Sequence, residues 1–124
     1  MKKTLIIISF MMMLAGGCTQ QGGEEIHPQW IRNAVIYEVN TRQITTEGTF
    51  NAFADMLPGL KELGVDVLWF MPIYPIGMEG RKGTLGSYYS IRDYGAVNPE
   101  FGTLEDFKLL VDKAHELGMK VILD

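Results

Sequence analysis

The chain has 124 residues, of which 47% are hydrophobic and 21% charged, with a single cysteine and a formal net charge of −4. This length allows one domain of modest size, and the apolar fraction is too high for a disordered chain. The acidic balance and the lone cysteine argue against a nucleic-acid-binding surface, a disulfide-stapled mini-protein and a zinc site built from several thiolates.

The first eighteen residues have the parts of an export signal. Lys2 and Lys3 precede the apolar run Leu5–Leu14, which is too short to span a bilayer, and small residues then lead to Cys18. This arrangement resembles the lipobox of bacterial lipoproteins, in which the cysteine is acylated after cleavage in front of it. Residues 1–17 are therefore predicted to be a signal peptide, with Cys18 as the lipidation site. Plain cleavage that leaves a free thiol is the alternative, and both predict export.

The lipoprotein resemblance implies attachment to a membrane, because several acyl chains hold a protein there far more firmly than one. Aspartate is absent directly after Cys18, which favours the outer membrane or the cell surface over a free periplasmic location. Residues 18–29 are largely polar and glycine-rich, so they are expected to form a flexible tether.

Beyond the tether, apolar runs alternate with segments of helical periodicity. Residues 34–39 are apolar and β-branched, which predicts a buried strand. A helix is expected over residues 49–64, with a kink or split at Pro58–Gly59. Residues 65–71 predict a second buried strand.

A long loop then separates this strand from the next helix. It runs for 31 residues, 72–102, and ends before Thr103 and Asp106, whose spacing predicts a capping box. Residues 121–123 begin a third strand that leads to Asp124. Structureless loops longer than about 15 residues are usually functional, and this loop lies at the carboxyl ends of the strands, where α/β folds bind ligands.

The order of these elements predicts the α/β class, with a parallel sheet and right-handed crossovers. A doubly wound open sheet and a (β/α)8 TIM barrel both fit this order. A barrel needs about 250 residues, so residues 30–124 would supply about three of its eight units. We therefore expect an incomplete chain that is truncated at Asp124, with a complete small α/β lipoprotein as the alternative.

Three sequence patterns add a more specific indication. Gly64 begins G-x-x-x-I/L-W-x-x-P, Tyr89 begins Y-x-I/V-x-D-Y, and Asn98 begins D/N-P-x-F/Y-G-T-x-x-D. Together they resemble the α-amylase family (glycoside hydrolase family 13), and the resemblance covers residues 30–124. It implies the N-terminal portion of a TIM (β/α)8 barrel.

The resemblance also implies a glycoside hydrolase or transglycosylase that acts on α-glucans such as starch, glycogen or maltooligosaccharides. Its retaining mechanism uses two carboxyl groups about 5–5.5 Å apart. The family places the nucleophilic Asp, the acid/base Glu and a third Asp on later strands. The chain of 124 residues is therefore expected to be inactive alone. Calcium is possible in the complete protein, and no cofactor is expected within this chain. A non-catalytic glycan-binding surface lipoprotein with an amylase-like barrel is the alternative.

Two residues are the candidate substrate-binding residues. The resemblance assigns Tyr89 to stacking against a sugar ring, whose apolar face suits an aromatic side chain. Asp124, at the carboxyl end of its strand, would be a supporting carboxylate that is neither nucleophile nor acid. The alternative for Tyr89 is that its ring only packs against the loop. The alternative for Asp124 is that its carboxylate only caps a loop at the end of the strand. Trp69 and Phe70, within a predicted buried strand, are expected in the core.

Overall fold

The computed structural model describes residues 27–124, so the predicted signal peptide of residues 1–17 and the lipidation site at Cys18 lie outside the described residues. The elements are the 3-10 helix η2 (Gln29–Asn33), β1 (Ile36–Val39), α2 (Thr41–Ile44), α3 (Phe50–Ala54), α4 (Leu57–Glu62), β2 (Val67–Phe70), α5 (Leu104–Glu116) and β3 (Lys120–Leu123). Within residues 27–124, no helix has the length and apolar character needed to cross a membrane.

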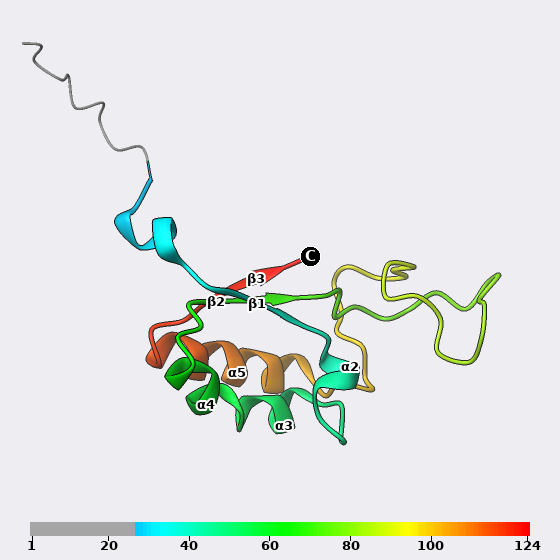
Figure 1. Cartoon of the computed structure of the whole chain (residues 1–124). Helices are drawn as coiled ribbons and strands as arrows, with labels where there is room; N and C mark the ends of the chain where they lie inside the picture. Colours follow the sequence, from blue (N-terminus) through cyan, green and yellow to red (C-terminus); the bar gives the residue numbers. More distant parts are fainter. Residues whose placement is uncertain (1–26) are drawn as a thin grey trace, which may run out of the picture. The chain divides into compact units, whose positions relative to one another are not determined.

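The three strands form one parallel sheet in the order β1-β2-β3. Val39 lies beside Phe70 in the register, and Phe70 lies beside Leu123. The N–H of Asp124 extends this register by one step, because it donates to the Phe70 carbonyl oxygen at 3.0 Å. Figure 1 shows α3, α4 and α5 together along one face of this sheet. Parallel strands with helical crossovers confirm the predicted α/β class.

The two faces of the sheet have different environments. Leu68 and Phe70 of β2 are fully buried against the helices, whereas Trp69 between them is 39% exposed. Ile36 and Ile122, in the neighbouring strands, are also exposed. The prediction of a core position is thus confirmed for Phe70 and wrong for Trp69. The reason is that successive side chains of a strand point to opposite faces, and these helices cover only one.

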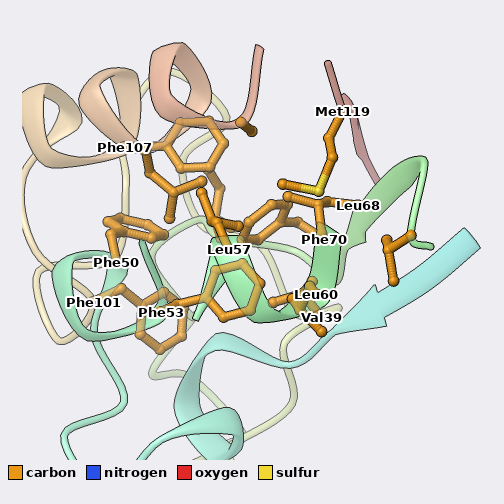
Figure 2. Close-up of a cluster of buried hydrophobic side chains, with 14 residues drawn as sticks. Val39, Phe50, Phe53, Leu57, Leu60, Leu68, Phe70, Phe101, Phe107 and Met119 are labelled. Carbon is orange, nitrogen blue, oxygen red and sulfur yellow. The ribbon is translucent and has the colours of Figure 1, made fainter. Parts of the chain in front are cut away.

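A cluster of phenylalanine rings joins the helices to the sheet. Phe70 stands edge to face with Phe53 of α3 at 5.6 Å between ring centroids, and with Phe107 of α5 at 5.5 Å. Phe50 packs against Phe107 at 5.1 Å and against Phe101 at 5.9 Å. Figure 2 shows these rings converging between the helices and β2. Phe70 is therefore the point where both α3 and α5 contact the sheet.

The predicted helix over residues 49–64 is two helices. Thr49 caps the start of α3, and its side chain accepts a hydrogen bond from the backbone N–H of Ala52. The break falls before α4, and Pro58 lies in the first turn of that helix. Proline fits there because the first turn leaves its N–H positions without intrahelical partners. A split is thus confirmed, but its predicted place is wrong, because α4 runs through Pro58 and Gly59 and the break lies between Ala54 and Leu57.

The capping box predicted at the start of α5 is confirmed. The Thr103 hydroxyl oxygen accepts from the N–H of Asp106, and the Asp106 carboxylate accepts from the N–H of Thr103 at 2.8 Å. Hydrogen bonds from the Thr103 side chain, from its backbone and from Asn51 lower the pKa of Asp106. A lowered pKa stabilises the fold at neutral pH, and this contribution is lost as the pH falls through that pKa.

Phe70→Ala tests the importance of the aromatic cluster for stability. We expect it to lower the free energy of unfolding by about 3–5 kcal/mol, because a fully buried ring is replaced by a cavity. Leu109→Ala, at a 57% exposed position of α5, is the matched control, with an expected change of about 0.5 kcal/mol or less. Urea unfolding measures both, and similar losses in the two variants would contradict this account of the core.

Candidate functional site

The loop between β2 and α5 is held by backbone pairing across its own length. Ile76 and Ile91 form an isolated antiparallel bridge, which brings the outgoing and returning halves together. Near its end, the N–H of Asn98 donates to the Ile73 carbonyl oxygen at 2.7 Å, and Asn98 is buried. Figure 1 shows this loop reaching out beyond the carboxyl ends of the strands. The loop therefore doubles back and returns Tyr89 to that edge of the sheet.

The two predicted site residues meet at this edge. The Tyr89 hydroxyl donates a hydrogen bond to Asp124 Oδ2 at 2.8 Å, although the two residues are 35 positions apart. Tyr89 is 57% exposed, so its side chain is accessible at the surface of the described residues. Asp124 directly follows β3 and is also exposed. The structure thus brings both residues together, and the sugar-binding roles assigned to them stay predictions.

The electrostatics of this pair follow from the carboxylates around it. The hydrogen bond to Asp124 is the largest cause that raises the pKa of Tyr89, followed by partial desolvation and the charges of Asp124 and Glu38. Glu38 in β1 pairs in register with Trp69, on the sheet face opposite the helices. The phenol therefore stays protonated and keeps donating. In such an arrangement, the aromatic ring can pack on the apolar face of a sugar, and the carboxylates can accept hydrogen bonds from the sugar hydroxyls.

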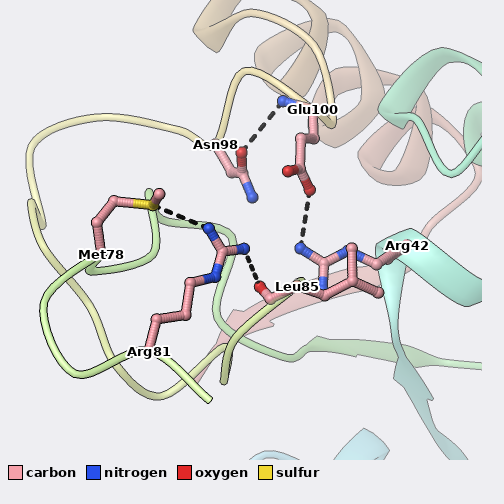
Figure 3. Close-up of polar contacts among 6 residues, drawn as sticks. All are labelled: Arg42, Met78, Arg81, Leu85, Asn98 and Glu100. Atoms are coloured by element: carbon pink, nitrogen blue, oxygen red, sulfur yellow. Dashed lines mark hydrogen bonds and ion pairs between the residues drawn. The ribbon is translucent and has the colours of Figure 1, made fainter. Parts of the chain in front are cut away.

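Sequence reasoning missed one well-connected side chain, which contacts the residue before Tyr89 in the chain. Arg42, on the unpredicted helix α2, forms an ion pair with Glu100, with 2.8 Å between Nη2 and Oε2. Its guanidinium carbon lies 4.8 Å from the centre of the Tyr88 ring and 5.8 Å from that of Phe101. Figure 3 shows Arg42 and Glu100 pointing toward each other. The sequence signal is faint, because Arg42 stands in a short connection without periodicity.

A second arginine organises the outer part of the loop. Arg81 donates to the sulfur of Met78 at 2.9 Å and to the carbonyl oxygen of Leu85 (Figure 3). A cavity of about 460 Å³ beside it is lined by Gly77, Glu79, Gly80, Arg81, Lys82, Gly86, Ser87 and Ser90. Arg81 therefore closes the turn between Met78 and Leu85.

A metal site built from side chains needs several ligating groups that lie close together. Within residues 27–124, no group of three or more histidine, cysteine, aspartate or glutamate side chains is placed to hold a metal ion. The calcium that the sequence resemblance allows for the complete protein stays a prediction.

Asp124→Asn tests the electrostatic coupling of the pair. We expect the pKa of Tyr89 to fall toward its ordinary value near 10, because the variant weakens the hydrogen bond from the phenol and removes the negative charge of Asp124, which both disfavour the phenolate. An ultraviolet pH titration, taken as the difference from the same protein with Tyr89→Phe, isolates this phenol. Asp112→Asn on α5 is the control and should leave the titration unchanged, and an unchanged titration in Asp124→Asn would refute the coupling.

Comparison with known proteins places this arrangement in a family. A family model described as alpha amylase, catalytic domain, matches residues 12–124. Alpha-amylase 3 of Dictyoglomus thermophilum is 36% identical, over 99% of this chain and 23% of that protein. A trehalose synthase of Pimelobacter sp. is 41% identical, over 82% of this chain and 17% of that protein. The chain therefore spans about a fifth of the length of these relatives.

A solved structure supports the same assignment. The crystal structure of an alpha-amylase from Lactobacillus plantarum superposes with a TM-score of 0.74 and 55% sequence identity, over 76% of this chain and 22% of that one. This similarity confirms the expected portion of a (β/α)8 barrel and excludes the doubly wound alternative. With its three parallel strands, helical crossovers and family match, the chain belongs to the α-amylase catalytic-domain family.

Proposed function

We propose that this chain is the N-terminal part of the catalytic barrel of an enzyme that cleaves or transfers α-glucans, namely starch, glycogen or maltooligosaccharides. The observation that carries the proposal is the exposed Tyr89 ring, hydrogen-bonded at 2.8 Å to Asp124 at the carboxyl end of the sheet. In barrel enzymes, the residues at these strand ends are the ones that contact substrate. The family membership of the chain supports the choice of an α-glucan.

In this proposal the described residues bind and orient the sugar. The Tyr89 ring packs on the apolar face of one glucose unit, while its hydroxyl is held by Asp124. Asp124 accepts hydrogen bonds from sugar hydroxyls and acts as a supporting carboxylate. The retaining reaction needs a nucleophile and an acid/base about 5–5.5 Å apart, and by the family resemblance these stand on strands after β3.

The experiment that tests the proposal begins with the complete reading frame of the gene. Translation beyond Asp124 should contain the Asp, Glu and Asp that the family places on later strands. The expressed protein should then release or transfer sugar from maltooligosaccharides. A complete frame without these acids, in a protein that binds glucans without cleaving them, would instead support the glycan-binding alternative.

Variants of Tyr89 test the role of the ring. In the complete protein, Tyr89→Ala should lower kcat/KM on a maltooligosaccharide by roughly 10- to 100-fold, because the sugar loses its packing surface. Tyr89→Phe keeps the ring and should lose less. Tyr94→Ala is the matched control, since this tyrosine belongs to the same loop and is 74% exposed. A loss in Tyr94→Ala equal to that in Tyr89→Ala would contradict the assignment.

We further propose that Cys18 carries the lipid that attaches the exported protein to the outer membrane or cell surface. The support is the sequence alone: a basic end, a short apolar run and small residues before the only cysteine of the chain. Cys18→Ala should abolish incorporation of labelled fatty acid and move the protein from the membrane to the soluble fraction. Ser9→Ala is the control, and unlabelled wild-type protein would refute the proposal.

A further inference from the structure

We propose that Arg42 is a positioning residue of this sugar-binding site, which holds Tyr88 and thereby fixes Tyr89 over Asp124. The inference rests on the proposed function for the importance of Tyr89. It assigns a role in α-glucan recognition to the short connection after β1, which carries none of the resemblance patterns.

The first step is the contact between Arg42 and Tyr88. The guanidinium carbon stands 4.8 Å from the Tyr88 ring centre, within the range of a cation–π interaction. A planar guanidinium can stack on such a ring, whereas the ammonium of lysine is a compact point charge. Because Tyr88 directly precedes Tyr89, holding the Tyr88 ring restricts where the backbone can carry the Tyr89 ring.

The second step is the anchor at the far end of the loop. Arg42 Nη2 lies 2.8 Å from Glu100 Oε2, and the N–H of Glu100 donates to Asn98 Oδ1 at 3.1 Å (Figure 3). Asn98 is buried and its own N–H bonds to the Ile73 carbonyl oxygen. Arg42 thus connects the middle of the loop, at Tyr88, to its fixed end.

The backbone of Arg42 is in close contact with the backbone of Gly48. It lies on α2, directly after β1, and the chain returns to it at Gly48. Gly48 has φ +65°, and a Cβ there would come within 2.8 Å of the Arg42 carbonyl oxygen. Glycine is needed at this position for both reasons. The backbone at Gly48 therefore packs directly against the backbone of Arg42.

Stability alone does not account for this placement. The Arg42 side chain is only 14% exposed, and its buried Nε has no hydrogen-bond partner. A buried donor without a partner costs stability. Glu100 is half exposed, and an ion pair to an exposed carboxylate adds little. What the arrangement supplies is a defined position for Tyr88 and the loop.

The test uses Arg42→Gln and Arg42→Lys in the protein expressed from its complete reading frame. We expect Arg42→Gln to lower kcat/KM on maltooligosaccharides by roughly 10- to 100-fold, as expected for a displaced binding group. Arg42→Lys should recover only part of this loss, because lysine keeps the charge without the planar stack. Arg92→Gln, an exposed arginine of the same loop, is the matched control and should behave as wild type.

A second readout separates positioning from general stability. The pKa of Tyr89, measured as the difference from the corresponding Tyr89→Phe protein, should fall toward its ordinary value in Arg42→Gln, because the phenol leaves Asp124. If Arg42→Gln only lowers Tm and leaves kcat/KM and the Tyr89 titration unchanged, the proposal is overturned. If Arg42→Gln does not fold, the same two readouts in Arg42→Lys decide.

The failure of the proposed function would be visible separately. A wild-type protein without activity on any α-glucan would refute that function, whereas the Tyr89 titration would still report whether Arg42 holds the ring. An unchanged titration in both Arg42 variants would then overturn the positioning role as well.

Discussion

The parallel register of the sheet is the constraint on which the rest of the structure depends. Side chains alternate between faces along a strand, so the register decides which residues meet the helices and which do not. It directs Phe70 into the aromatic cluster and leaves Glu38 and Trp69 side by side on the other face. A slip of β3 by one residue would turn its side chains over and carry Asp124 away from Tyr89.

The parts of the fold that sequence could predict are those encoded by neighbouring residues. The capping box of Thr103 and Asp106 spans only four residues and acts within one helical turn, so its spacing suffices to predict it. Helix α2 escaped prediction because its four residues are too few to show a helical period. The core position predicted for Trp69 was wrong because an apolar run identifies a strand without saying what covers each of its faces.

The residues of the candidate site also differ in whether the sequence alone could identify them. Tyr89 could be named from the sequence because it begins a pattern that resembles a family, and Asp124 because it ends a predicted strand, although only the structure shows the 2.8 Å hydrogen bond between them. Arg42 could not be named, since its ion-pair partner Glu100 is 58 positions away and only the folded loop brings the two together. Contacts across such distances leave no periodic trace in a single sequence.

The core and the site are held together by different interactions, and this difference has a consequence. The sheet and helices rely on buried rings centred on Phe70, whose many small dispersion contacts sum to a large packing energy. The loop is held by backbone pairs, such as the bridge between Ile76 and Ile91, and by polar side chains, Arg42 and Asn98 among them. Such polar contacts add little to the free energy of unfolding, yet each one fixes the orientation of the side chains that it joins. Arg42 touches both parts, because its guanidinium lies over Tyr88 of the loop and over Phe101, which packs against Phe50 in the core. A change at Arg42 is therefore expected to move the loop around Tyr89 and to reach the aromatic cluster through Phe101.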